Sequence, residues 1–125
     1  MTKEKFAEKF VELFPDKKEM LSEHYNEYEK LLGHVFFGDE INIPLVKLLL
    51  KNTDKSLIQK YCSFVEDMWN NGNDEVRNIV EVTIVEYISD NIDIWKRFGE
   101  YISNEFKNDI NNLIIPIIDT TPSKL

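Results

Sequence analysis

The chain has 125 residues, a formal net charge of −8, 42% hydrophobic residues and only four glycines and four prolines. The length and hydrophobic content predict one domain with a single packed core, and the scarcity of glycine and proline disfavours an all-β sandwich. The negative charge argues against a nucleic-acid-binding role, and the absence of a long uncharged apolar run argues against a membrane span. A single cysteine and a charged N-terminal segment without a signal-peptide pattern predict a cytoplasmic protein.

Hydrophobic residues at helical spacing predict three helices in the first part of the chain, over residues 2–14, 17–32 and about 43–51. Pro15 ends the first of these helices, because proline cannot continue the backbone hydrogen-bond ladder. Between the second and third helices, residues 34–43 are expected to form an irregular connection. Gly38 and Asp39 in this segment are typical of a turn.

Two consecutive helices, 54–71 and 74–89, form the centre of the chain. The first carries a continuous apolar face at i, i+3, i+4 and i+7 spacing, made by Ile58, Tyr61, Cys62, Val65, Met68 and Trp69. Gly72 is expected to end this helix in the left-handed conformation, which glycine adopts without a Cβ clash. The second helix is rich in β-branched residues, so a strand competes over part of it, but its length and capping residues favour a helix.

The last part of the chain predicts a helix over residues 92–107, bent near Gly99, and a short helix or extended piece over residues 109–118. Residues 118–125 are polar and are expected to form a frayed tail. Short connections between helices favour antiparallel neighbours. The sequence therefore predicts an all-α fold, a single domain over residues 1–125 with about six to seven antiparallel helices, arranged as a HEAT-like helical-repeat stack or a bundle.

The sequence contains no motif typical of an enzyme, and we expect no catalytic residue, no metal site and no cofactor. Cys62 lies in the middle of an apolar helix face, where a structural role is favoured over a reactive thiol. His24 lies on the apolar face of the second helix without a second histidine or cysteine at a metal-binding spacing. We therefore expect a binding protein and not an enzyme.

Acidic residues are concentrated between positions 64 and 100, where nine carboxylates face three basic residues. Ordinary solubilising charge explains this distribution about as well as an acidic surface that meets a basic partner protein. On the second hypothesis the candidate contact residues are Glu66, Asp67, Asp74, Glu75, Asp90 and Asp93, with Trp69 as an aromatic anchor. They lie at helix ends and cannot all share one surface, so the 66–75 group is the first candidate.

Two segments, HVFFGDEINIPLVKLLLKN and FVEDMWNNGNDEVRNIVEVTIVEYI, resemble small helical immunity proteins of bacterial polymorphic and contact-dependent growth-inhibition toxin systems. The similarity covers about residues 30–103, and it includes no catalytic motif. It implies tight binding to a cognate toxin domain, often a nuclease, and occlusion of its active site. A nuclease needs a basic surface for its substrate, and a small acidic protein is complementary to that surface.

Two other hypotheses remain open. A helical-repeat adaptor would bind a peptide or an assembly partner through an apolar surface, without a toxin-neutralising role. A small enzyme or ligand-binding bundle would instead contain an internal cavity lined by His24, Tyr25 or Tyr28. The sequence does not predict the oligomeric state or the identity of the partner.

Overall fold

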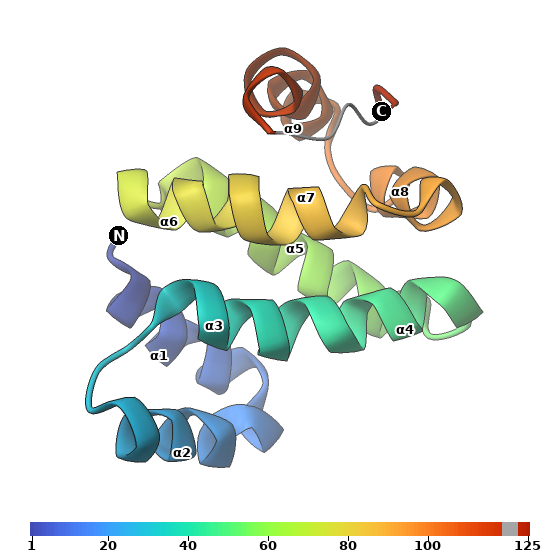
Figure 1. Cartoon of the computed structure of the whole chain (residues 1–125). Coiled ribbons are helices and arrows are strands. Elements are labelled where there is room, and N and C mark those ends of the chain that lie inside the picture. The colour runs from blue at the N-terminus through green and yellow to red at the C-terminus, as the bar shows by residue number, and fades with distance from the viewer. Residues whose placement is uncertain (119–122) are drawn as a thin grey trace.

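The computed structural model describes residues 1–118 and 123–125, and every regular element in these residues is helical, which confirms the predicted all-α fold (Figure 1). None of these helices combines the length and the apolar character that crossing a membrane requires. In chain order the α-helices are α1 (Lys3–Leu13), α2 (Lys18–Tyr28), α3 (Gly33–Phe37), α4 (Ile43–Lys51), α5 (Lys55–Asn71), α6 (Asp74–Ile79), α7 (Glu86–Ile88), α8 (Ile92–Gly99) and α9 (Asn104–Asp109).

Turns of π-helix join several of these α-helices end to end. The π-helical turn Gly38–Asn42 joins α3 to α4, and the π-helical turn Val80–Val85 joins α6 to α7. We call the two continuous elements long helix 33–51 and long helix 74–88. A third π-helical turn, Ile110–Ile114, extends α9. Such turns are rare in proteins and occur frequently at functional sites.

The prediction of an irregular connection over residues 34–43 is wrong, because this segment is the first half of long helix 33–51. Phe36, Phe37 and Ile41 are buried on one side of it. Helical stability in proteins comes mainly from packing an apolar face, and this burial outweighs the local turn preference of Gly38. The helix continues through that glycine in a π-helical turn.

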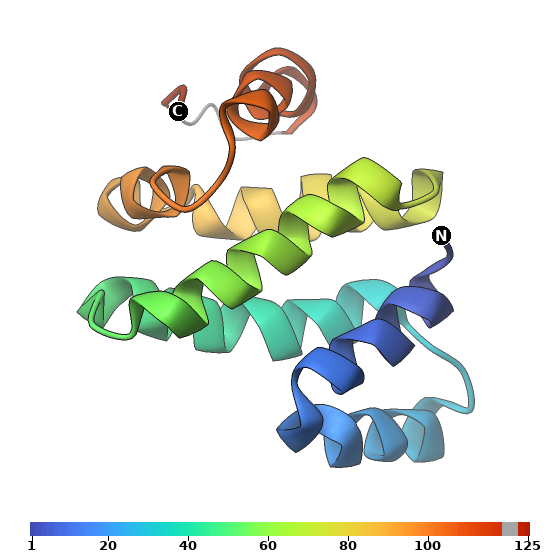
Figure 2. The ribbon, with the colours of Figure 1, turned by 180° about the vertical axis from the view of Figure 1, so that it is seen from behind.

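The helices stack in two layers. Figure 1 shows α2, long helix 33–51 and long helix 74–88 side by side in one layer, and Figure 2 shows α1 and α5 lying across the back of it. Helix α5 connects the two long helices along the chain and runs in the opposite direction to both, so the long helices themselves run parallel to each other. From α1 to long helix 74–88 the chain reverses direction at each connection between helices, whereas α8 and α9 are seen nearly end-on in both figures and lie across the long helices.

A cluster of aromatic rings forms one centre of the core, where α1, α3 and α5 meet. The Phe10 ring lies 5.9 Å from Phe36 and 5.2 Å from Phe64, measured between ring centroids, and all three side chains are buried. Edge-to-face and tilted ring pairs of this kind stabilise a core beyond the area that they bury. The cluster joins the N-terminal helix to the middle of the stack.

Polar side chains begin the helices where the sequence indicates. Thr2, Asp54 and Asn73 each accept a hydrogen bond from a backbone N–H in the first turn of α1, α5 and α6, respectively. The end of α5 differs from the prediction, because Gly72 has φ −76° and is not left-handed. A Cβ atom at Gly72 would lie 2.3 Å from the carbonyl oxygen of Met68, so glycine is required there by close contact and not by its torsion angles.

The C-terminal part also departs from the prediction. The expected helix over residues 92–107 is two helices, because α8 ends at Gly99 and Ser103 caps the start of α9. The predicted frayed tail lies partly outside the described residues, since 119–122 are not described. Beyond that gap, Ser123 accepts a hydrogen bond from Trp95 Nε1 at 2.6 Å, and the Leu125 backbone forms two hydrogen bonds with the Asn111 side chain.

Candidate functional site

Two of the predicted contact residues, Glu66 and Asp67, form polar contacts within the chain. Glu66 accepts a hydrogen bond at 2.9 Å from the backbone N–H of Ser103, the residue that caps α9. Asp67 forms an ion pair with Lys9 of α1 and accepts a second hydrogen bond from Asn71 at 2.6 Å. Both carboxylates therefore join α5 to other parts of the chain, which reduces what they can offer to a partner.

Trp69, the predicted aromatic anchor, lies in the core with 3% of its surface exposed. Its Nε1 donates a hydrogen bond to Asp109 at 2.9 Å, and the Arg77 guanidinium lies 4.5 Å from the centre of its ring. Arg77 also donates to the Trp69 carbonyl oxygen at 2.9 Å. These contacts tie α5 to α6 and α9 and leave little of the indole for an interface.

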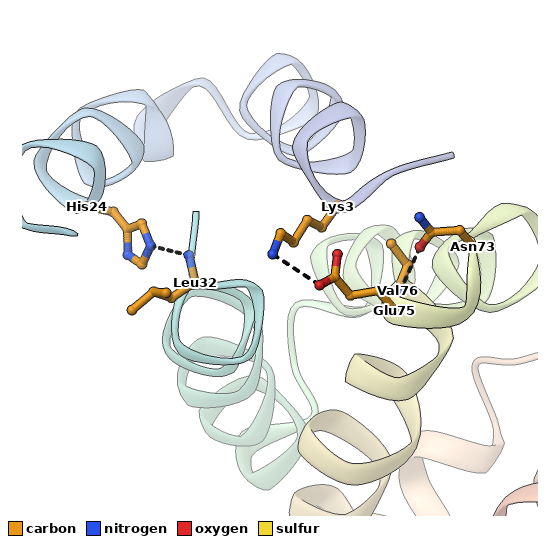
Figure 3. A network of polar contacts seen from close by, with 6 residues as sticks. All are labelled: Lys3, His24, Leu32, Asn73, Glu75 and Val76. Carbon is orange, nitrogen blue, oxygen red and sulfur yellow. Dashed lines mark hydrogen bonds and ion pairs between the residues drawn. The ribbon is translucent and has the colours of Figure 1, made fainter. Parts of the chain in front are cut away.

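Asp74 and Glu75 lie in the first turn of α6, where their negative charge is favourable near the positive end of the helix dipole. Figure 3 shows Glu75 pointing toward Lys3 of α1, and the two side chains form an ion pair at 3.2 Å. Asp74 is exposed. Within the 66–75 group, Glu66 and Asp67 line one open pocket of about 380 Å3 beside α5, whereas Trp69, Asp74 and Glu75 lie outside it.

The two remaining candidates, Asp90 and Asp93, are exposed on either side of Asn91, the residue that caps α8. They differ in their surroundings. Asp90 lines an open groove between the two long helices, whereas Asp93 lies outside it. Only one of the seven predicted contact residues therefore belongs to that groove.

This groove, which we call the acidic groove, lies between the two long helices and has a volume of about 560 Å3. From long helix 33–51 it is lined by Gly38, Asp39, Asn42 and Ile43. From long helix 74–88 and the turn after it, it is lined by Val82, Thr83, Glu86, Tyr87 and Asp90. Three carboxylates and no basic side chain belong to this lining, so it presents negative charge to a ligand.

The π-helical turns of both long helices meet at the acidic groove. Gly38 lies so close to the other helix that a Cβ atom there would be 3.2 Å from the Thr83 side chain. Asn42, which is 3% exposed, donates a hydrogen bond from Nδ2 to the Thr83 carbonyl oxygen at 3.0 Å. Thr83 has a second polar contact on the exposed side, where Nδ1 of His34 in α3 lies 2.6 Å from the Thr83 hydroxyl. Two helical irregularities are thus held against each other by polar contacts.

The acidic groove combines its charge with exposed apolar surface. Ile43 and Tyr87 are each about half exposed, and Val82 is 40% exposed. An interface typically has aromatic and aliphatic contacts beside polar groups that select the partner. The mixture suits a basic protein segment that also carries apolar side chains.

Cys62 and His24, whose side chains could be chemically reactive, are both buried in the fold. Burial, together with the nearby Glu66 carboxylate, raises the pKa of the Cys62 thiol to about 12, so the nucleophilic thiolate is scarce at neutral pH. His24 is buried, and its Nε2 accepts a hydrogen bond from the Leu32 backbone N–H at 3.0 Å, as Figure 3 shows. That bond holds the connection between α2 and α3.

His24 and Tyr28 also line a small open pocket of about 210 Å3 on the surface, together with several carboxylates. Tyr25, the third residue proposed for an internal cavity, does not line it. In the described residues, no group of three or more histidine, cysteine or carboxylate side chains is placed to hold a metal ion.

Sequence reasoning missed most of the acidic groove. Asp39 and Asn42 fall in the segment expected to be irregular, and Glu86 and Tyr87 are not among the predicted contact residues. The available signal was the charge of GDEIN at 38–42 and of VEY at 85–87, each next to long apolar runs. Placing both segments on facing helices would have required the helical assignment of residues 33–43.

The described part of the chain is an all-helical stacked domain with an acidic, partly apolar groove between its two long helices. The chain belongs to the family described as Domain of unknown function (DUF7674), which it matches over residues 7–115. No curated protein and no solved structure matches the chain.

Proposed function

We propose that this chain is a cytoplasmic protein-binding domain that recognises a basic partner protein through the acidic groove. The observation that carries the proposal is the groove lining, in which Asp39, Glu86 and Asp90 lie beside exposed apolar side chains without a compensating basic residue. Complementary charge of this kind increases the rate and the specificity of association. The formal net charge of −8 extends the same preference over longer distances.

Within this class, we propose that the partner is a bacterial toxin domain and that the chain acts as its immunity protein. The resemblance of residues 30–103 to immunity proteins supports this assignment, and so does the acidic character of the groove. A toxin that cleaves nucleic acid exposes a basic substrate-binding surface. Neutralisation then needs only tight binding over that surface, and no chemical step by this chain.

The test is calorimetric binding to the C-terminal domain of the protein encoded immediately upstream of this gene, at about 50 mM and about 200 mM salt. A triple variant of the groove, Asp39→Asn, Glu86→Gln and Asp90→Asn, is compared with a control triple of exposed residues outside it, Glu12→Gln, Glu19→Gln and Glu105→Gln. Both variants remove three negative charges. We expect the groove triple to weaken binding by about tenfold or more and to reduce its salt dependence, while the control changes neither strongly.

Equal effects of the two triples would show that only net charge matters and would overturn the groove as the binding site. Absence of binding at micromolar concentration would overturn the toxin assignment. Salt-insensitive binding that depends on Ile43, Val82 and Tyr87 would instead favour the adaptor hypothesis, because these exposed apolar side chains would then supply the interface.

A further inference from the structure

We propose that the acidic groove binds one arginine side chain of the partner, with the guanidinium donating to Asn42 Oδ1 and to the carboxylates of the groove. This inference rests on the proposed function, since it names the chemical group that the same groove would recognise. Its basis is the side-chain oxygen of Asn42, a buried hydrogen-bond acceptor without a donor whose residue lines the groove.

Asn42 Oδ1 is buried and has no hydrogen-bond partner among the described residues. The orientation of the amide is determined by Thr83, whose carbonyl oxygen lies 3.0 Å from Asn42 Nδ2 and must be met by a donor. Reversing the amide would place two oxygen atoms against each other at that distance. A buried acceptor left without a donor is unfavourable, so a ligand that supplies one gains binding energy there.

The groups around this oxygen suit a guanidinium better than an ammonium. Asp39 lies one helical turn before Asn42, and Glu86 on the facing helix and Asp90 in the turn after it line the other side of the groove, so carboxylates of the lining come from both sides. Arginine carries five N–H donors in a rigid planar fork and can meet an amide oxygen and a carboxylate at once. The exposed Tyr87 ring at the rim adds a surface on which a guanidinium can stack.

Asn42 belongs to the groove lining, but its Oδ1 is itself buried. On this proposal a donor reaches Oδ1 only when side chains of the lining move aside, and the exposed Val82 and Tyr87 are the ones we expect to move. This requirement adds selectivity, because a short or weakly bound cation gains too little to displace them. It also predicts that arginine binding changes the environment of the Asn42 side chain and not only that of the exposed residues of the groove.

The test is an NMR titration of the full isotope-labelled chain with three capped amino acids: N-acetyl-arginine-methylamide, its lysine counterpart and its citrulline counterpart. Citrulline has the same shape as arginine without the charge. We expect saturable shifts of the Asn42 side-chain amide and the Thr83 backbone amide with arginine, weaker binding of lysine and none of citrulline. Asn42→Leu should weaken arginine binding about tenfold, the size expected for a lost hydrogen bond to a charged donor. Asp93→Asn, outside the groove, should leave it unchanged.

Equal affinities for arginine and lysine, or shifts spread over carboxylates throughout the surface, would overturn the arginine site. The wild-type titration decides the question even if Asn42→Leu fails to fold. Because the probes are small molecules, this result is separate from the toxin-binding experiment. The partner protein could still bind the groove without an inserted arginine, and an arginine site could exist although the partner is not a toxin.

Discussion

Asn42 donates a hydrogen bond from its side-chain amide to the backbone carbonyl oxygen of Thr83, and it joins the two long helices where both depart from α-helical geometry. A π-helical turn disturbs the regular pairing of backbone groups, and buried carbonyl oxygens need a donor. The Asn42 amide supplies one across the helix interface. The same side chain leaves its own oxygen without a donor beneath the acidic groove.

Replacing Asn42 with aspartate should destabilise the protein strongly at neutral pH. The carboxylate would face the Thr83 carbonyl oxygen at a position that is 3% exposed, and we expect a loss of about 3 kcal/mol in the free energy of unfolding. Burial raises the pKa of such a carboxyl group above its unfolded value, so the variant recovers stability as the pH falls and the group takes up a proton. Urea unfolding at pH 7 and near pH 4 measures both effects.

The matched control is Asn108→Asp, which introduces the same charge at an exposed position in α9. It should change the free energy of unfolding by no more than about 0.5 kcal/mol at either pH. Equal destabilisation by the two variants would show that the Asn42 hydrogen bond does not hold the long helices together.

A second prediction concerns the end of α5. Gly72→Ala should lower the free energy of unfolding by about 2 kcal/mol, because the new Cβ would lie 2.3 Å from the Met68 carbonyl oxygen and 2.5 Å from Val76 Cγ1. Gly38→Ala is the comparison, since its Cβ meets only the end of the Thr83 side chain, at 3.2 Å. Thermal unfolding of both variants should show the larger loss at Gly72, and the reverse order would contradict the contact argument.

The sequence predicts helices well wherever an apolar face and a capping residue coincide, as in the segment between Asp54 and Gly72. It fails at residues 34–43, because glycine and aspartate carry a local turn preference while the decisive burial of Phe36, Phe37 and Ile41 depends on distant parts of the chain. The extra residue of a π-helical turn also rotates the face that follows it. A count of helical spacing across Gly38 therefore cannot place Asn42 correctly.

The candidate contact residues show the same limit. Their position near helix ends is visible in the sequence, but their partners are not. Lys3 and Lys9 of α1 reach Glu75 and Asp67 only because α1 packs against α5 and α6 in the folded stack. An acidic cluster in sequence thus becomes a set of separate intramolecular pairs, while Asp39 and Asp90, 51 positions apart, line one groove.

A third prediction is a loss of stability at alkaline pH. Burial raises the pKa of the Cys62 thiol from 9.0 to about 12, with a smaller contribution from Glu66, and burial raises the pKa of the Tyr61 hydroxyl from 10.0 to about 12. The folded protein keeps both protons at pH values where the unfolded chain releases them, so ionisation favours unfolding. The stabilising effect is complete below about pH 9 and is lost as the pH rises toward 12.

Urea unfolding at a series of pH values from about 7.5 upward tests the loss of stability, with Cys62→Ala and Tyr61→Phe as the variants. Each variant lacks one ionisable group, so its free energy of unfolding should fall less steeply with pH than that of the wild type. The Cys62 thiol should also react with iodoacetamide far more slowly in the folded protein than in urea. Rapid reaction of the folded protein would contradict the buried, protonated thiol.

A fourth prediction separates residues that hold the fold from residues that meet a partner. Asp67→Asn and Glu66→Gln should each lower the free energy of unfolding by about 1 kcal/mol, because the first breaks the ion pair with Lys9 and the second weakens the hydrogen bond to the Ser103 backbone. Neither should change the affinity for a basic partner by more than about twofold, since both carboxylates are engaged within the chain.

Asp90→Asn should behave in the opposite way, because Asp90 is exposed and lines the acidic groove. We expect it to leave the free energy of unfolding within about 0.5 kcal/mol of the wild type and to weaken partner binding and its salt dependence. Urea unfolding and calorimetry on the same three variants measure both properties. If Asp67→Asn weakened binding as much as Asp90→Asn without loss of stability, the binding surface would lie at the 66–75 group, and the acidic groove would have to be abandoned as the partner site.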